Sequence, residues 1–528
     1  MKDYAKIYKD EIESFRETGH RFLNGELTVP EFKGKSGGFG VYAQRGGKKF
    51  MIRLRTPSGL VSLPHYKLTM DYVKKYGLDK VHLTTRQTFQ LHDLEFDDVC
   101  DIMADAIDHD LFTRGGGGNY PRNVALSPLS GVEKGEAFDV TPFALMVSEY
   151  FVSRASTYHL PRKLKVAFSN GEHDTGCATI NDVGFMAVIE NGEPCFKLFL
   201  AGGMGSNPEL SIPYSKTVKP EEVMYYVEAM VRLFMEKGNY ENKHRARMRY
   251  IPKEIGTDEF IACLEKYLKE VKETEKFEEI HATVEKEEKW ENTEAEHPLL
   301  IPQKQKGLYS VKIHPVCGQM SAELFHKIGT FLEEHENCKK EDGSEKEKGL
   351  EVRLSLDEDM YIRNLTASEA KELLALAKGE AQETKVDMTV TCVGVPTCQI
   401  GILQSQALCR SIKDAVEKAN LKSNLLPTIH ISGCPNSCSR HQVAELGFAG
   451  KKKRVEDSVA EVYDVFVGGA LGLGKTKMGE VLGSMKVSEI PAFIVNLAST
   501  LEEKEVYFDK FFCESRGEFD QIAALYLV

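Results

Sequence analysis

Four cysteines in two short turns are the residues best suited to chemistry. The turn TCVGVPTCQIG holds Cys392 and Cys398, and the turn ISGCPNSCSRH holds Cys434 and Cys438, with a helical stretch between them. Zinc sites usually space their thiolates by two residues, with a second such pair downstream. Four thiolates from separate loops can instead hold a cubane iron-sulfur cluster. The cluster is the favoured interpretation, and zinc or four unligated core cysteines remain the alternatives.

Basic side chains at alternate positions form a second group. Arg53 and Arg55 alternate in FMIRLRTPSG, and Lys163 and Lys165 alternate in LPRKLKVAFSN. Alternate positions of a strand point to one face of a sheet, so each pair can converge on one ligand. The two lysines interrupt an otherwise apolar strand, which favours an anion as the ligand over a solvated surface role. Arg122, in GGGGNYPRNV, joins this set.

The elements that must position these residues occur twice along the chain. Each half has the pattern of an alternating strand, a helix, a second strand, a turn and another helix. The matching blocks, in the same order in both halves, are 50–59 with 309–318, 81–94 with 352–365, 160–170 with 426–436, 182–187 with 445–450, and 199–205 with 466–472. We therefore predict a duplicated α+β unit of mixed sheets flanked by helices, with the active site in the cleft between the halves.

This alignment sets cations of the first half against a second half that carries the cysteines. Arg86 matches Asp357, while Lys163 and Lys165 match Ile429 and Ile431. One half is thus expected to bind metal and the other to gather positive charge.

The segment GALGLGKT, at 469–476, fits a phosphate-binding loop and would suggest an ATPase. Its counterpart in the first half, GGMGSNPE, lacks the Gly-Lys-Thr. The shared feature is a Gly-Gly turn after a strand, so the ATPase stays only as an alternative.

Composition narrows the function classes. A chain of 528 residues exceeds one ordinary core, and roughly two to four domains are expected. The net charge of −12, without a long basic stripe, argues against nucleic-acid binding. The N-terminus lacks the apolar segment of a secretory signal, and no apolar run is long enough to span a membrane. We expect a cytoplasmic protein that does not enter a membrane.

At this point the chain resembles the siroheme-dependent sulfite and nitrite reductases. The resemblance runs from about Gly37 to Gly472 and is carried by C-x5-C with CPN-x-C and by the blocks R-x-R-x-P-x-G, TTRQTFQ, RNV and LPRK-x-K. It implies that one thiolate of a 4Fe-4S cluster also ligates the siroheme iron. By position that shared ligand is Cys438, and Cys392, Cys398 and Cys434 complete the cluster.

The resemblance also implies roles for the cations. The substrate anion is expected among Arg53, Arg122, Lys163 and Lys165, because cations offset the charge of an anion that approaches an anionic cofactor and can pass protons to departing oxygens. The carboxylates of siroheme are expected to contact Arg55, Arg86, Gln90, Arg247 and Asn436. His82 stands where some members of the family have another arginine, so one cofactor contact is expected to be weaker or replaced there.

The implied architecture is a pair of ferredoxin-like halves plus two mixed α/β siroheme and cluster domains around a central cleft. Glu and Lys dominate the stretch 263–300, which is typical of an exposed helix that runs into a linker. The expected divisions are 1–125 and 301–385 for the ferredoxin-like halves, 126–262 for the domain of anion-binding cations, 263–300 for the linker, and 386–528 for the cluster domain.

The predicted reaction is the six-electron reduction of sulfite to sulfide. In the family, plant-type nitrite reductases tend to have asparagine at the place of Lys165, whereas sulfite reductases have lysine. The serine in CPNSC leans toward nitrite, so reduction of nitrite to ammonia is the alternative. A simple 4Fe-4S electron carrier and a precorrin-type oxygenase are further alternatives.

The sequence shows no flavin or nicotinamide module, and electrons are therefore expected from a separate ferredoxin-like protein. The basic run in GKKKRVED, at 450–457, follows the cluster turn. It is either a solvated hairpin tip or a docking patch for an acidic donor.

Overall fold

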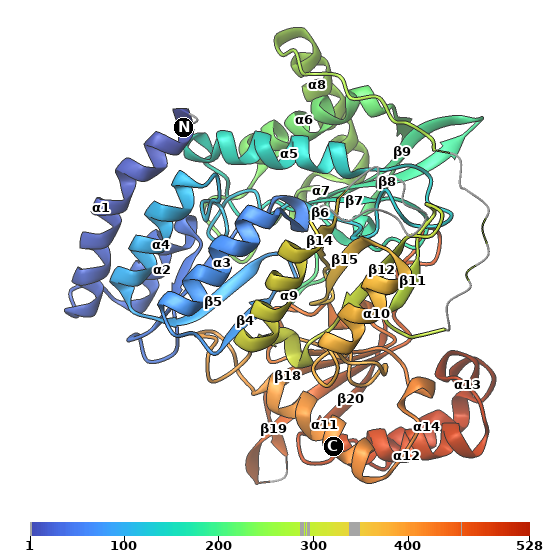
Figure 1. Cartoon of the computed structure of the whole chain (residues 1–528). Coiled ribbons are helices and arrows are strands. Elements are labelled where there is room, and N and C mark those ends of the chain that lie inside the picture. Colours follow the sequence, from blue (N-terminus) through green and yellow to red (C-terminus); the bar gives the residue numbers. More distant parts are fainter. Residues whose placement is uncertain (1–2, 286–289, 291, 293–295, 337–348, 456) are drawn as a thin grey trace.

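The computed structural model describes residues 3–285, 290, 292, 296–336, 349–455 and 457–528, and it contains four five-stranded sheets with helices packed around them (Figure 1). The first sheet holds β1 (Val41–Ala43), β2 (Phe50–Leu54), β5 (Phe89–Leu94), β4 (Lys80–Leu83) and β13 (Gln319–Ser321) in that order. The second sheet holds β11 (Leu300–Pro302), β12 (Tyr309–Ile313), β15 (Met360–Leu365), β14 (Glu351–Leu354) and β3 (Leu60–Val61).

These two antiparallel sheets exchange their edge strands. β13, from the second half, pairs with β4 of the first half, and β3, from the first half, pairs with β14 of the second. Neither sheet is complete without a strand from the other half, so the duplicated units are interlocked.

The third sheet holds β10 (Ile212–Val218), β9 (Glu193–Leu200), β8 (Val183–Glu190), β7 (Val166–Ser169) and β6 (Ala125–Leu126). The fourth holds β16 (Val390–Thr391), β17 (Ile429–Ser432), β18 (Leu446–Val455), β19 (Ser458–Val467) and β20 (Glu480–Lys486). Both have two parallel pairs followed by two antiparallel pairs, which confirms the predicted duplication and the mixed α+β fold.

The strand pairing corrects one block of the sequence alignment. Val166 lies opposite Val183 at the start of β7, and Ile429 lies opposite Leu446 at the start of β17. Val166 therefore corresponds to Ile429, and the predicted match of Lys163 with Ile429 is wrong by three residues. The misalignment arose because the segments LPRK and LPTI are similar in sequence. Sequence similarity alone contains no information on which strands pair.

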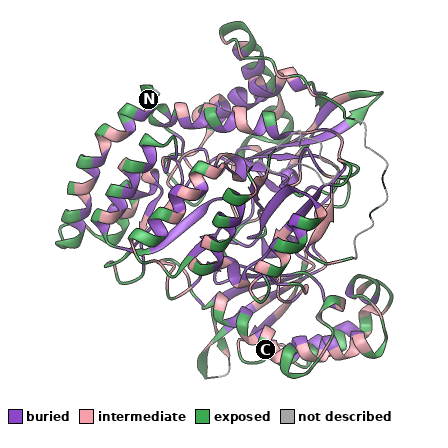
Figure 2. Cartoon of the chain, viewed as in Figure 1, coloured by how far each residue is buried: buried purple, intermediate pink, exposed green. Residues whose placement is uncertain are grey.

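The helices cover the outer faces of the sheets and bury their inward sides (Figures 1 and 2). They are α1 (Asp3–Leu23), α2 (Val29–Ser36), α3 (Leu63–Lys75), α4 (Phe96–Asp108), α5 (Thr141–Ser153), α6 (Val223–Lys237), α7 (Ile251–Ile255), α8 (Thr257–Thr274), α9 (Ala322–Glu334), α10 (Ala367–Leu376), α11 (Ser405–Lys418), α12 (Ile490–Glu503), α13 (Phe508–Glu514) and α14 (Arg516–Ala524). None of the described helices is long and apolar enough to cross a membrane.

The helix starts repeat as the strands do. The Ser62 hydroxyl accepts from the His65 N–H at the start of α3, and the Ser321 hydroxyl accepts from the Leu324 N–H at the start of α9. Serine at this position satisfies a backbone donor that the helix itself leaves free.

One hydrophobic core joins the two ferredoxin-like halves. It includes Phe50 and Ile52 of the first half together with Val311 and Ile313 of the second. On the facing helices, Tyr66 of α3 stacks on Phe325 of α9 with ring centroids 4.3 Å apart.

The GALGLGKT segment does not have the setting of a nucleotide loop. Such a loop leads from a strand into a helix. Here the segment follows β19, turns back on itself through a hydrogen bond from the Gly472 N–H to Thr476 Oγ1, and leads into β20. The ATPase alternative therefore lacks its structural basis.

Candidate active site between the two halves

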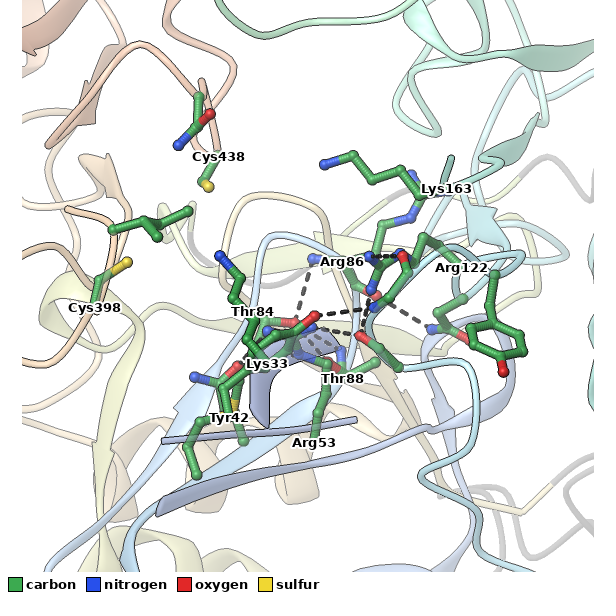
Figure 3. Close-up of a pocket in the computed structure, with 18 of the residues that line it drawn as sticks. Lys33, Tyr42, Arg53, Thr84, Arg86, Thr88, Arg122, Lys163, Cys398 and Cys438 are labelled. Carbon is green, nitrogen blue, oxygen red and sulfur yellow. Dashed lines mark hydrogen bonds between the residues drawn. The ribbon is translucent and has the colours of Figure 1, made fainter. Parts of the chain in front are cut away.

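A cavity of about 1320 Å³ lies between the two halves. Figure 3 shows Cys398 and Cys438 on one side of it, facing Arg86, Arg122 and Lys163 across the space. The predicted residues that line the cavity are Arg53, Arg55, Arg86, Gln90, Arg122, Lys163, Lys165, Cys392, Cys398, Cys434, Asn436 and Cys438. Among the predicted site residues, Arg247 is the one that does not line it.

The cysteine wall is built from two turns of the fourth sheet. Cys392 and Cys398 lie between β16 and α11, and Cys434 and Cys438 follow β17. The Gly433 N–H donates to Cys392 Sγ at 3.2 Å, and the side-chain amide of Asn436 donates to Cys434 Sγ at 3.3 Å. Donors of this kind stabilise thiolates that ligate a metal.

These thiols fit a cluster that replaces their protons. Burial raises the pKa of Cys398 and Cys434 above the usual value of a thiol, so without a metal they stay protonated. Iron binding would displace those protons. In the described part of the chain, no three His, Cys, Asp or Glu side chains meet closely enough to hold a single metal ion. The four thiols instead border one side of a large cavity.

Two arginines of the facing wall are held by neutral partners. Arg53 donates from Nε and Nη2 to Gln90 Oε1 at 3.1 and 2.8 Å. Arg122 donates to the carbonyls of Gly116 and Gly118 at 2.7 and 2.8 Å. Carbonyl and amide oxygens orient a guanidinium without cancelling its charge, so both arginines keep their charge for an anionic ligand.

The glycine loop that holds these arginines tolerates no side chain at its centre. A Cβ on Gly117 would lie 2.3 Å from the Gly37 carbonyl oxygen and from Tyr42 Oη. The GGGG run is therefore required for the close packing of 115–118 against the segment around Gly37.

The two lysines lie just before β7 and not inside it. Leu164, between them, bridges to Pro121, and the strand begins only at Val166. Burial, together with the charges of Arg247 and Arg122, lowers the pKa of Lys163 to about 7. Burial and the neighbouring Lys163 lower the pKa of Lys165 well below its ordinary value. An incoming anion would favour protonation of both.

The remaining predicted cofactor contacts differ in their settings. Arg86 donates to Asn181 Oδ1 at 3.2 Å and to the Val166 carbonyl at 3.1 Å, and Arg55 donates to the Pro121 carbonyl at 3.3 Å. Arg55 is buried, Arg86 is half-buried, and both line the cavity.

Arg247 lies behind the cavity wall. Its Nη2 donates to both carboxylate oxygens of Asp182 at 3.1 Å, in a buried ion pair. The structure thus does not bring Arg247 to the cavity as a cofactor contact, although its charge lowers the pKa of Lys163 from behind.

His82, noted above as a departure from the family pattern, lines the cavity with His92. Burial lowers the pKa of each ring to about 3, so both are neutral. The Gln90 amide donates to His92 Nε2 at 2.8 Å while its oxygen accepts from Arg53. This corner of the cavity therefore adds no further positive charge, but it fixes Arg53 through Gln90.

The sequence analysis missed Glu358, Cys177 and Arg440, which also line the cavity. Arg440 pairs with Asp357, the residue that corresponds to Arg86 in the other half. The duplicated block 352–365 already placed Glu358 opposite Gln87, so its signal was present in the alignment.

Comparison with known proteins agrees with this geometry. Residues 117–272 and 383–505 match the family model of the nitrite and sulphite reductase 4Fe-4S domain, and residues 42–108 match that of the nitrite/sulfite reductase ferredoxin-like half domain. The chain is 31% identical over 440 residues to the chloroplastic ferredoxin–nitrite reductase of Spinacia oleracea, over 80% of this chain and 70% of the relative.

Two further relatives extend the match. The assimilatory ferredoxin-dependent nitrite reductase of Haloferax mediterranei is 24% identical over 524 residues, which cover 94% of this chain and 86% of the relative. The solved structure of the Mycobacterium tuberculosis NirA protein has a TM-score of 0.74 at 23% identity, over 89% of this chain and 87% of that one, and shows the same fold. The chain belongs to the nitrite and sulfite reductase family, the oxidoreductases that join a siroheme to a 4Fe-4S cluster.

Proposed function

We propose that this enzyme reduces nitrite to ammonia with six electrons from a ferredoxin-type donor. The observation that carries the proposal is the cavity in which a four-cysteine wall faces Arg53, Arg122, Lys163 and Lys165, for which the described residues provide no carboxylate partner. The sequence predicted sulfite as the substrate. The relatives named above as ferredoxin-dependent nitrite reductases support nitrite instead.

Residues on the two walls of the cavity are proposed to have different roles. Cys392, Cys398, Cys434 and Cys438 would hold the cluster, with Cys438 shared with the siroheme iron, and Arg55, Arg86, Gln90 and Asn436 would contact the siroheme carboxylates. When bound, the two groups supply electrons one at a time to the anion. Arg53 and Arg122 bind that anion and offset its charge.

Lys163 is suited to move protons at neutral pH. A group whose pKa lies near the working pH both holds and releases a proton readily, and burial brings Lys163 to about 7. Its ammonium can protonate an oxygen that leaves the anion as water, and the neutral amine can then be recharged.

Sulfite remains a second candidate because of Lys165. Both lysines line the cavity, and a lysine at this place is the family feature that favours the more heavily oxygenated, more highly charged anion. Together, the ammonium groups of Lys163 and Lys165 can offset more negative charge than the single charge of nitrite.

Steady-state kinetics on the anaerobically purified, fully loaded enzyme test the proposal. With reduced methyl viologen as donor, we expect a larger kcat/KM for nitrite than for sulfite, and ammonia as the product. A larger kcat/KM for sulfite, with sulfide formed, would move the assignment to sulfite reduction. Absence of siroheme absorption from active preparations would contradict both.

A further inference from the structure

Glu358 is a buried carboxyl group with one oxygen left free. It lies in the turn between β14 and β15, is 1% exposed and lines the active-site cavity. The Thr391 N–H donates to its Oε2 at 3.0 Å. Oε1 is buried and makes no hydrogen bond among the described residues. A buried polar atom without a partner is costly, so a function is expected for it.

The corresponding residue of the first half shows what is different about Glu358. Gln87 has the same left-handed backbone, with φ of 56° against 67°. Its Oε1 accepts from the Leu126 N–H at 2.9 Å, as Glu358 accepts from Thr391. The Gln87 amide nitrogen then donates to the carbonyls of Leu126 and Leu354, both at 2.7 Å. Glu358 keeps the acceptor of this arrangement, but its second oxygen has no hydrogen-bond partner among the described residues.

The surroundings hold Glu358 in its neutral form. Burial raises its pKa well above the usual value of a carboxyl group, against the lowering effects of the Thr391 hydrogen bond and of Arg440, and the nearby Cys317 and Asp357 raise it further. The charge of Glu358 also acts on Cys409, which contacts Cys317. The described residues that line the active-site cavity include two carboxyl groups, Glu358 and Glu11. Glu11 pairs with Arg114 at 3.1 Å.

A second cavity, of about 500 Å³, lies behind this wall. It shares Cys177 and Arg440 with the active-site cavity and is also lined by Asp357. The Asp357 side chain is 54% exposed and pairs with Arg440. Glu358 and Asp357 are thus adjacent in the chain but line different cavities. Glu358 lines the active-site cavity, and Asp357 lines the second cavity and is exposed to solvent.

We propose that Glu358 is a proton relay, which takes protons from solvent in the second cavity by way of Asp357 and delivers them to the active-site cavity. Reduction of nitrite to ammonium consumes eight protons with the six electrons, so the site needs proton donors close to the anion. The inference rests on the proposed function only in that the anion is reduced there, and it holds equally for sulfite.

The transfer is balanced at each step. The O–H bond of the Glu358 carboxyl breaks, and its proton passes to an oxygen that leaves the anion as water or to the neutral amine of Lys163. The Glu358 carboxylate then regains a proton from the Asp357 carboxyl group. Water of the second cavity in turn protonates the Asp357 carboxylate. No electron passes through the relay, since all of them come from the ferredoxin-type donor.

The protonation state is tested by infrared spectroscopy, independently of turnover. We expect the wild-type enzyme at neutral pH to show the C=O band of a protonated carboxylic acid, and we expect Glu358→Gln to lack it. The variant is matched to the fold, because glutamine keeps the acceptor for Thr391 and is the residue found at Gln87. A wild-type enzyme without such a band would overturn the proposal.

Kinetics test the relay, with whichever of nitrite and sulfite the wild-type enzyme turns over. Glu358→Gln should lower kcat at least about tenfold with KM for the anion and the siroheme spectrum unchanged, and small weak acids should restore part of the rate. Glu445→Gln, which changes a carboxylate of the second cavity away from Glu358, should keep wild-type kcat. An unchanged kcat in Glu358→Gln, or a lost siroheme spectrum, would overturn the relay.

The outer end of the path is tested by Asp357→Asn. This variant should lower kcat less than Glu358→Gln does, because water can still reach the shared wall. Two steps in one series are not additive, so the double variant should be no slower than Glu358→Gln alone. Multiplied losses in the double variant would place Asp357 outside the path and overturn this part of the proposal.

Discussion

The cations of the site differ in how the fold tunes them. Arg53 and Arg122 donate to neutral oxygens and stay charged, whereas Lys163 and Lys165 are half-buried beside other cations, which lowers the pKa of each. The arginines are therefore suited to provide fixed charge, and the lysines to provide exchangeable protons. Sequence spacing predicted that these residues converge, but it could not show this division, because the pKa of each lysine depends on Arg247 and Arg122 from other segments.

Lys163 should make anion use depend on pH. Because burial brings its pKa to about 7, its ammonium form is lost as pH rises through that value in the absence of a ligand. We expect kcat/KM for the anion to fall over this range in the wild type. In Lys163→Arg the charge persists, so the falling limb should move to higher pH. Profiles of kcat/KM against pH for both proteins measure this, and superimposable profiles would exclude Lys163 as the titrating group.

Lys165 should separate the two substrates. Lys165→Asn removes one half-buried cation from the cavity wall, and the more highly charged and more heavily oxygenated sulfite relies more on that cation and its proton. We expect kcat/KM for sulfite to fall by at least about tenfold more than kcat/KM for nitrite. Rates with both anions under the same donor provide the comparison. Equal losses would remove the charge argument for specificity while leaving the family assignment intact.

At the scale of elements, the duplication was readable in the sequence and the interlocking was not. Repeated blocks gave the correct strand and helix order, because each block keeps its own apolar alternation. The exchange of β3 and β13 could not be predicted from local sequence. Edge strands of two or three residues are too short to specify a partner, so the partner is determined by the tertiary fold. The domain boundaries at 125, 262, 300 and 385 remain predictions.

The interlocked halves should unfold together. Phe325 is fully buried and stacks on Tyr66 of the other half, whose hydroxyl also donates to the Phe325 carbonyl at 3.0 Å. Phe325→Ala should cost about 3–5 kcal/mol of unfolding free energy. Hydrogen exchange should show both halves losing protection to the same extent. The exposed Val459→Ala serves as the control, with little change expected. Loss of protection confined to the second half would show that the halves are independent.

At the scale of the whole molecule, an acidic electron donor is expected to dock where surface cations are not offset by neighbouring carboxylates. The basic run at 451–454 lies in β18, where Lys451 pairs with Asp464 of β19 at 2.6 Å, Lys452 lies 4.0 Å from Glu461, and Lys453 donates to the Val528 carbonyl. The adjacent strand thus offsets much of the charge that made this run a candidate docking patch.

The rim of the cluster turn offers a better surface. Ile400 and Ile402 are 52% and 38% exposed there, and Arg45 donates to the Gly401 carbonyl at 2.8 Å. Lys33 and Lys35 line the adjacent cavity mouth. Exposed apolar side chains ringed by cations suit an acidic, ferredoxin-type donor, because charge speeds the encounter and apolar contact holds it near the cluster.

Paired charge reversals distinguish the two faces. Lys33→Glu with Lys35→Glu should raise the KM for reduced ferredoxin and flatten its dependence on salt, since long-range attraction is what salt screens. Lys451→Glu with Lys452→Glu, the matched control, should change that KM much less. Turnover with reduced methyl viologen should stay the same in both, because a small dye needs no docking surface. A larger effect from the hairpin pair would move the donor to that face, and equal losses with both donors would show that Lys33 and Lys35 act on the anion and not on docking.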